Sequence, residues 1–267
     1  MPLFKNKWEV PDELIMQLRS RFFDELRSDE DLYHPDDIER VKDNDWFIGR
    51  YLLHMEKDVD KAFHMLTESL KYRKDKKVME YKGHVTNYYL YLAALRKKDL
   101  PREYFDARAI FLYNKDKRDH PVVVVRCKTH VKKEETRRQQ LQYMLYWIEK
   151  GVRAADWGVV SILFDCTDSG VGNVDLEMMR QLFEAFRKYY PWGLGYFLVY
   201  NMPWYLSAVW RIIKQWIPQR HVSKISFVDA NGLKDFMLEE QLPLCMGGTS
   251  TKMYEPKDGF KDGDESE

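Results

Sequence analysis

Acidic and hydroxyl side chains that could do chemistry stand together in the segment Asp165-Cys166-Thr167-Asp168-Ser169, directly after an apolar run at residues 159–164. A phosphoaspartyl enzyme or a metal-dependent hydrolase uses two carboxylates and a hydroxyl of this kind. The order differs from the usual D-x-D-x-T arrangement, and no further acidic cluster supplies a second metal ligand. The pattern therefore favours a turn in which Asp and Ser bond nearby backbone amides, with a hydrolase as the minor alternative.

Other motifs of catalysis are incomplete. The segments 170–172 and 193–195 each contain G-x-G but lack the third glycine of a dinucleotide-binding loop, and the seven histidines form no H-E-x-x-H pair. The three cysteines, Cys127, Cys166 and Cys245, lie far apart without a C-x-x-C pair, which argues against a disulfide scaffold or a cysteine-based zinc module. The sequence therefore predicts a protein that is not an enzyme, with no catalytic residues, no metal and no cofactor.

The composition of the chain is that of a globular protein. It has 267 residues, of which 45% are hydrophobic and 32% charged, and its formal net charge is zero. The charges are unevenly placed, because residues 51–150 carry 23 basic against 14 acidic side chains, an excess of nine. A basic middle segment could face an anionic membrane or nucleic acid, although a solvated helical surface is the preferred interpretation. No run of about 18 apolar residues predicts a membrane-spanning helix, and the first ten residues do not resemble a signal peptide.

Two kinds of structure are predicted around these residues. Residues 1–80 predict a small helical subdomain, because apolar side chains recur at helical spacing after residues 12, 35 and 58. Residues 81–252 contain four short apolar runs that predict strands, at 121–127, 159–165, 197–200 and 223–228. Helical stretches separate these runs, at 134–150, 174–189 and 204–217. The alternation predicts an α/β domain with a mainly parallel sheet flanked by helices, followed by an acidic disordered tail at residues 253–267.

Aromatic residues are concentrated between residues 186 and 216, where eleven of 31 positions are Phe, Tyr or Trp. The predicted helix 204–217 within this stretch is apolar over much of its circumference. Such a helix is either buried or in contact with lipid, and it is too short to cross a bilayer. Core packing and a mobile lid over a lipid cavity both fit this pattern.

Short motifs along residues 10–250 occur in the order of a known family. They are Tyr189-Tyr190-Pro191, Asn201-Met202-Pro203-Trp204, Trp210, Lys224-Ile225, Leu242-Pro243 and Gly247-Gly248. In these motifs, and in the helical segments 45–59 and 62–73, the chain resembles the CRAL-TRIO lipid-binding family. Asp165 followed by Gly170 is similar to the family's turn after a strand. The segment 116–126 is similar to a strand entry of the family, with Asp119-His120-Pro121-Val122 in place of a Gly-Arg-Pro-Val type sequence.

This resemblance implies a domain that is not an enzyme and that takes up one lipid or other hydrophobic molecule in an apolar cavity closed by a helical gate. By position the gate corresponds to residues 204–217. The residues expected to form the gate and the cavity are Trp204, Leu206, Val209, Trp210, Ile213, Trp216, Ile217 and Tyr200. Arg211 and Lys214 on the same helix are expected to lie near anionic headgroups when the gate docks on a membrane.

The positions at which related proteins hold phosphatidylinositol differ here. An Arg-Lys pair corresponds to Met55 and Glu56, a Glu corresponds to Trp192, and a Thr corresponds to His221, whereas the headgroup lysine is retained as Lys224. Lys224, His221 and Trp192 remain the candidate headgroup contacts. Because a buried phosphate needs several cationic or amide donors, a neutral, choline-type or wholly apolar ligand is preferred.

The expected partners are a lipid or hydrophobic small molecule and, transiently, a membrane surface, with no nucleic acid. The resemblance implies a cytoplasmic location, peripheral at organelle membranes. An alternative function is a recruitment or interaction module that binds membranes or lipid droplets through the amphipathic helix 204–217 and has a vestigial cavity.

Overall fold

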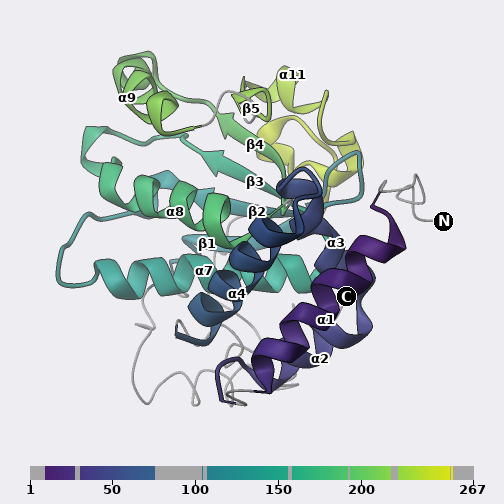
Figure 1. The fold of residues 1–267 in the computed structure, drawn as a ribbon. Helices are drawn as coiled ribbons and strands as arrows, with labels where there is room; N and C mark the ends of the chain where they lie inside the picture. Colours follow the sequence, from purple (N-terminus) through teal and green to yellow (C-terminus); the bar gives the residue numbers. More distant parts are fainter. Residues whose placement is uncertain are drawn as a thin grey trace, which may run out of the picture. The chain divides into compact units, whose positions relative to one another are not determined.

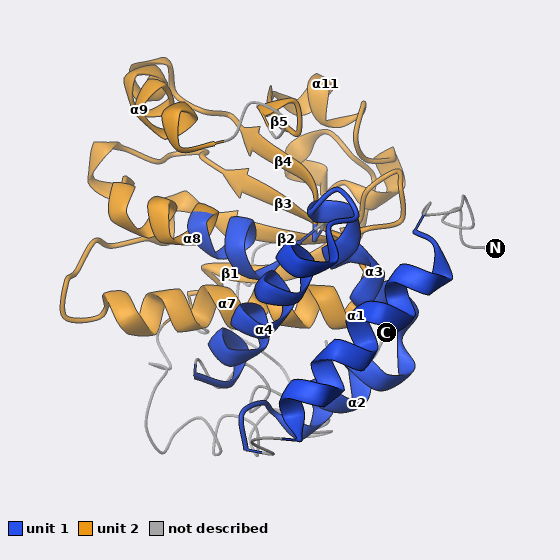
Figure 2. Ribbon diagram, viewed as in Figure 1, with its two compact units in different colours: residues 1–81, 184–193 blue, residues 82–183, 194–267 orange. Residues whose placement is uncertain are grey.

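The structure is a computed structural model that describes residues 10–27, 31–75, 104, 107–155, 158–191, 193–217, 222–252 and 254. The chain divides into two compact units, one formed by residues 1–81 and 184–193 and the other by residues 82–183 and 194–267 (Figure 2). Of the predicted tail at 253–267, only Tyr254 lies within the described residues, so the tail stays a prediction.

Helices form the described part of the first unit before residue 76. They are α1 (Asp12–Leu26), α2 (Pro35–Asp43), α3 (Asp45–His54) and α4 (Val59–Asp75) (Figure 1). The side chain of His34 accepts a hydrogen bond from the amide of Asp36, and that of Asn44 from the amide of Phe47. These caps begin α2 and α3 where the sequence changes from loop to helix.

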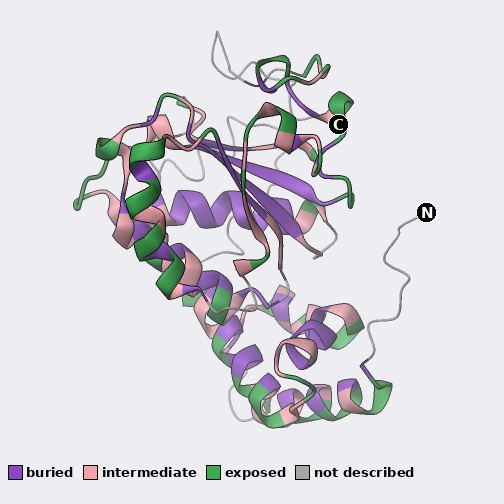
Figure 3. Cartoon of the chain, turned by 90° about the horizontal axis from the view of Figure 1, so that it is seen from above, coloured by how far each residue is buried: buried purple, intermediate pink, exposed green. Residues whose placement is uncertain are grey.

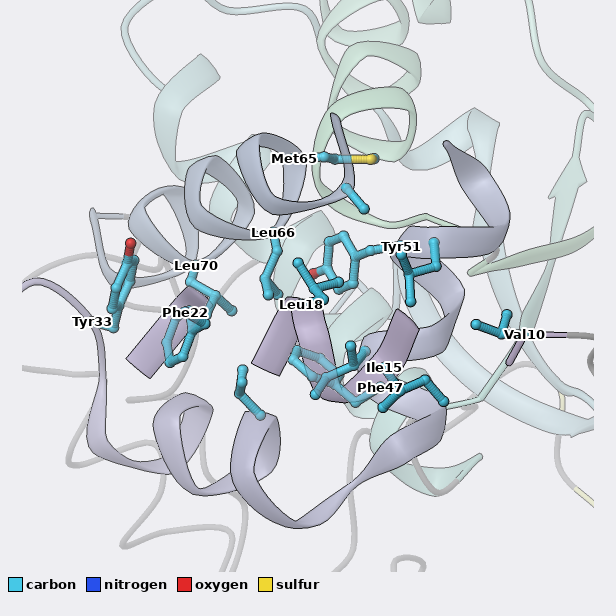
Figure 4. Close-up of a cluster of buried hydrophobic side chains, with 14 residues drawn as sticks. Val10, Ile15, Leu18, Phe22, Tyr33, Phe47, Tyr51, Met65, Leu66 and Leu70 are labelled. Atoms are coloured by element: carbon cyan, nitrogen blue, oxygen red, sulfur yellow. The ribbon is translucent and has the colours of Figure 1, made fainter. Parts of the chain in front are cut away.

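Fourteen buried side chains form the core of these helices (Figure 4). Phe22 of α1, Phe47 of α3 and Leu66 of α4 are fully buried at its centre. A buried carboxylate accompanies this core: both oxygens of Asp37 lie 3.2 Å from Nε of Arg73, and Oδ1 lies 2.5 Å from Nη1 of Arg40. The apolar spacing of the sequence thus produces a helical core of its own.

The second unit contains a five-stranded sheet in the order β1-β2-β3-β4-β5. The strands are β1 (Ile110–Lys115), β2 (Pro121–Arg126), β3 (Val160–Asp165), β4 (Leu194–Tyr200) and β5 (Ile225–Val228). Strand β1 pairs antiparallel with β2, and the other neighbours pair in parallel. The predicted α/β fold with a mainly parallel sheet is confirmed, and β1 is an additional strand that the sequence did not predict.

The connections place helices on one face of this sheet. Helix α7 (Arg137–Ala154) links β2 to β3, α8 (Leu176–Tyr189) links β3 to β4, and α9 (Ser207–Ile213) lies between β4 and β5. Right-handed crossovers between successive neighbouring strands all return on the same side. Gly151 lets α7 approach closely, because a Cβ there would lie 3.1 Å from methyl groups of Val123 and Val160. Strands β2 and β3 are buried along their whole length (Figure 3).

The C-terminal part of the chain contacts the opposite face. The hydroxyl of Tyr254 donates to Oδ2 of Asp165 at 2.9 Å, and the hydroxyl of Tyr113 donates to the carbonyl of Lys252 at 2.9 Å. The ring of Tyr254 also packs edge-on against Phe111, with the ring centres 5.4 Å apart. These contacts fix the end of the described chain under β1 and β3.

A buried carboxylate ties the β1–β2 turn to β3. Oδ2 of Asp116 lies 2.9 Å from Nδ1 of His120 and accepts a hydrogen bond of 2.6 Å from the hydroxyl of Ser161. Burial by itself raises the pKa of Asp116, but the hydrogen bonds from His120 and Ser161 outweigh it and lower the pKa below its usual value. The charged form of Asp116 therefore stabilises the fold.

Candidate ligand cavity

A cavity of about 340 Å³ lies between the helical face of the sheet and helices α7, α8 and α9. Its floor includes one row of residues in register across four parallel strands: Val125, Phe164, Val199 and Phe227. Cavities for small-molecule ligands measure roughly 300–1,000 Å³ and are mostly apolar, so this one has the size and floor of a ligand pocket.

Stacked aromatic rings build part of the cavity wall. Phe197 of β4 stacks on Phe164 of β3 with the ring centres 4.9 Å apart, and Phe183 of α8 lies 5.3 Å from Phe197. Met178 and Met179 of α8 extend the lining. Aromatic rings and thioethers offer an apolar and adaptable contact surface, which suits hydrocarbon better than a polar metabolite.

Helix α9 and the turn before it cover this cavity. Four of the residues predicted for the gate line it: Leu206, Val209, Trp210 and Ile213. The indole of Trp210 packs edge-on against Phe227 of β5, with the ring centres 4.9 Å apart. Phe227 lines the cavity and is also 42% exposed, so the cavity opens to solvent beside α9.

The other predicted gate and cavity residues do not line the cavity. Trp204 is 85% exposed, Trp216 is half-buried and Ile217 is buried elsewhere. Tyr200 is buried, but it is adjacent to Val199 on β4 and therefore points to the opposite face of the sheet. The predicted helix 204–217 is itself divided into a 3₁₀ turn at Trp204–Leu206, α9, and a second 3₁₀ turn at Lys214–Trp216.

The outer side of this segment carries the residues predicted to dock on a membrane. Arg211 and Lys214 are exposed, and Ile212 between them is 43% exposed. The hydroxyl of Tyr205 donates to the carbonyl of Ser169 at 2.8 Å, which ties the start of the segment to the loop after β3. The segment thus has an apolar inner side over the cavity and an outer side with cations and exposed apolar side chains.

Of the candidate headgroup contacts, only Lys224 is among the described residues. Lys224 does not line the cavity, and its Nζ donates to the carbonyl of Leu194 at 2.6 Å. Burial, together with the nearby guanidinium of Arg118, lowers the pKa of Lys224. Trp192 and His221 lie outside the described residues.

Polar residues that the sequence did not predict also line the cavity. They come from the loop after β2, the start of α7 and the loop before α8, and include Thr129, His130, Thr136, Gln140 and Asp175. Burial lowers the pKa of His130 and outweighs the opposite influence of Asp175, so the imidazole is favoured in its neutral form. Asp175 is at least 35 residues from the other four, and no motif connects them.

Two thiols meet at the edge of the cavity. The sulfur atoms of Cys127 and Cys166 lie 3.7 Å apart, although 39 residues separate them, and both residues line the cavity. Both are free cysteines. The hydrogen bond with Cys166, together with burial, raises the pKa of the Cys127 thiol. Cys127 is therefore a neutral thiol at pH 7.

The acidic segment after β3 does not bring its two carboxylates to this cavity. Asp165 is buried, and its Oδ1 accepts a hydrogen bond of 3.0 Å from the amide of Thr167, as in the predicted turn. Asp168 is exposed and lies 3.6 Å from Nζ of Lys128. Within the described ranges, no group of three or more His, Cys, Asp or Glu side chains is placed to hold a metal ion. None of the helices in the described part of the chain combines the length and apolar character needed to cross a membrane.

Comparison with known proteins agrees with this geometry. The sequence model of the CRAL/TRIO domain matches residues 106–248, just over half of the chain. The chain is 31% identical over 148 residues to the phosphatidylinositol transfer protein CSR1 of Eremothecium gossypii, and 26% identical over 148 residues to the CRAL-TRIO domain-containing protein C3H8.02 of Schizosaccharomyces pombe. Each match covers 54% of this chain and 33% of the relative.

A solved structure has the same fold. The crystal structure of Sfh5 superimposes with a TM-score of 0.65 at 16% sequence identity, covering 92% of this chain and 90% of that chain. The match of the domain model over residues 106–248 includes all five strands and the three helices around the cavity. The chain therefore belongs to the CRAL/TRIO domain family, as the sequence motifs predicted.

Proposed function

We propose that this chain is a lipid-binding domain that is not an enzyme, and that it takes up one hydrophobic molecule in the cavity beneath α9. The observation that carries the proposal is the cavity itself: about 340 Å³, floored by aromatic and aliphatic side chains and covered by a helix whose inner side is apolar. Water gains little by occupying such a space, whereas a hydrocarbon chain is stabilised by leaving water.

The way α9 and the turn before it are held supports a gating role. Leu206, Trp210 and Ile213 line the cavity with apolar side chains, and the hydroxyl of Tyr205 donates a hydrogen bond to the carbonyl of Ser169. Opening would expose these side chains, and a bilayer interface would receive them with Arg211 and Lys214 close to anionic headgroups. We infer that the domain opens at membranes and transfers its ligand between them, as a cytoplasmic protein peripheral at organelle membranes.

The residues at the expected headgroup positions bear on which lipid the cavity takes up. The name of the Eremothecium gossypii relative assigns phosphatidylinositol to that protein. In this chain Met55 and Glu56 take the place of the expected Arg-Lys pair, and only Lys224 is retained among the positions that hold the inositol phosphate. A neutral, choline-type or wholly apolar ligand therefore remains the preferred prediction. Within the family, we predict a resemblance to the CRAL-TRIO part of motile sperm domain-containing protein 2.

A second candidate is a membrane-recruitment module with an unused cavity. The exposed Trp204, together with Ile212, Arg211 and Lys214 on the outer side of the same segment, favours it. Transfer and recruitment differ in what happens to the lipid, because only transfer removes a molecule from the membrane.

A vesicle assay separates the two. Donor vesicles carrying a self-quenched fluorescent lipid are mixed with unlabelled acceptors, and recovery of fluorescence on adding the protein reports transfer. Flotation of the protein with the same vesicles reports docking alone. We expect both signals; flotation without transfer would favour the recruitment module, and absence of both would reject both candidates.

A further inference from the structure

The cavity has one polar wall within its otherwise apolar lining. Its members are His130 from the loop after β2, Thr136 and Gln140 at the start of α7, and Asp175 before α8. The amide of Gln140 donates from Nε2 to the carbonyl of Val131 at 2.8 Å, beside His130. Nε2 of His130 in turn lies 3.6 Å from Oδ2 of Asp175. These side chains form one continuous surface, which we call the polar wall.

Asp175 is the most buried member of the polar wall. Its side chain is only 2% exposed. Oδ1 accepts a hydrogen bond of 3.0 Å from the amide of Met178 at the start of α8, whereas Oδ2 accepts none from any residue that the structure describes. Two side-chain nitrogens face Oδ2, Nε2 of the neutral His130 at 3.6 Å and Nε of Arg137 at 4.0 Å, and both are too far for a direct hydrogen bond.

The other members of the polar wall also have unpaired buried atoms. Within the described part of the chain, Oε1 of Gln140, Oγ1 of Thr136 and Nε2 of His130 are buried without a hydrogen-bond partner. Folded proteins pair the great majority of buried polar atoms, because an unpaired one loses its bond to water without compensation. Several unpaired atoms on one cavity wall therefore point to a polar group of a ligand that enters the cavity.

The mixture of donors and acceptors selects among head groups. Asp175 and Gln140 present acceptor oxygens, whereas Thr136 presents a hydroxyl and His130 an imidazole nitrogen. A phosphate offers acceptors only and would meet the carboxylate of Asp175 at this wall, since the cationic lining residues Arg126 and Lys133 are not members of the polar wall. A choline ammonium has no N–H to donate. A hydroxyl group donates and accepts at once, so it satisfies both kinds of atom.

We propose that the polar wall is a binding subsite for the free hydroxyl of an uncharged lipid of the diacylglycerol type. The inference rests on the proposed lipid-binding function and names the class of ligand. The subsite is separate from Lys224 and the other positions at which related proteins hold an inositol phosphate, because Lys224 does not line this cavity. The hydrocarbon chains would then lie against the apolar floor formed by residues such as Phe164 and Phe197.

Three matched probes test the proposal: dioctanoylglycerol, its O-acetyl derivative and dioctanoyl phosphatidic acid. They share their acyl chains and differ only at the group that would meet the polar wall. Dissociation constants are measured for the whole chain by displacement of a fluorescent fatty acid. We expect dioctanoylglycerol to bind at least about tenfold more tightly than either other probe, because a site that bonds a hydroxyl rejects analogues that lack it.

Two variants probe the wall and one serves as a control. Asp175→Asn keeps an oxygen that can cap α8, and Gln140→Leu removes the acceptor at Oε1; each should reduce the preference for dioctanoylglycerol to about threefold or less. Asp168→Asn removes an exposed carboxylate that does not line the cavity and should leave the preference unchanged. Thermal unfolding of each variant confirms that it is folded.

The outcomes separate the two proposals. Equal binding of all three probes to the unaltered chain, or an unchanged preference in both wall variants, would overturn the hydroxyl subsite and leave lipid binding intact. Such a result would assign the polar wall to ordered water. Binding of none of the probes, of vesicle lipids or of the fluorescent fatty acid would overturn the proposed function and this inference with it.

Discussion

Replacement of Trp210 by aspartate tests whether α9 contributes directly to ligand binding. Trp210 lines the cavity and packs against Phe227, so Trp210→Asp removes apolar contact area and places a charge on the cavity wall. If about 100 Å² of the indole contacts the ligand, at roughly 25 cal/mol per Å² the loss is about 2.5 kcal/mol, or about 60-fold in Kd. Loss of the aromatic pair lowers the stability of the fold by only about 1 kcal/mol.

Ile212 provides the matched control for this substitution. It stands on the same helix two residues further on, is 43% exposed and does not line the cavity. Binding is measured with a fluorescent lipid below its critical micelle concentration, so that membrane docking plays no part, and stability with urea. We expect Trp210→Asp to weaken binding about 60-fold and Ile212→Asp less than about threefold. Equal Kd values for Trp210→Asp and the unaltered chain would refute the assignment of α9 as the cover.

Three further predictions concern the stability of the fold. The pKa of Asp116 is lowered below its usual 3.8, so its charged form contributes stability above pH 3.8 that is lost as the pH falls. Urea unfolding should therefore show that Asp116→Asn lowers the unfolding free energy more at pH 6 than at pH 3. Gly248→Ala should lower the unfolding free energy by about 1–3 kcal/mol, because the new Cβ would lie 2.2 Å from the carbonyl oxygen of Leu242; an unchanged urea midpoint would contradict this. Asp37→Asn removes the buried carboxylate that pairs with Arg73 and Arg40, and should cost about 3–5 kcal/mol in denaturant unfolding of the helical unit; a cost below about 1 kcal/mol would show that this carboxylate is dispensable.

The strands show what the sequence pattern could predict. The run from Val122 to Val125 is β-branched and too short for a helix, and it forms the fully buried strand β2. The strand β1 was missed because its apolar residues, from Ile110 to Tyr113, form a run too short to distinguish a strand from a helical turn. These residues form a strand because they pair antiparallel with β2, and such pairing depends on residues outside the run.

The sequence pattern could also predict only some of the residues that line the cavity. Of the apolar arc predicted for residues 204–217, Leu206, Val209, Trp210 and Ile213 line the cavity, whereas Trp204, Trp216 and Ile217 do not. Tyr200 was expected there too, but a strand alternates its side chains between two faces, and the register that assigns each face is set by the neighbouring strands.

The polar wall could not be predicted from sequence patterns. Asp175 is 45 residues from His130, and each taken alone is typical of a helix cap or a surface loop. They meet because β2 and β3 are parallel neighbours, so the loops that leave their carboxyl ends lie side by side. The side chains of those loops acquire a common role only once the sheet has formed.

Mass spectrometry under native conditions shows whether the chain carries a lipid. The whole chain is purified without detergent, its intact mass is measured, and any bound molecule is extracted into solvent and identified. We expect one lipid per chain, uncharged and with a free hydroxyl, and its loss in Trp210→Asp but not in Ile212→Asp. A chain that carries no lipid, and remains empty after incubation with mixed vesicles, would contradict the proposed lipid-binding function.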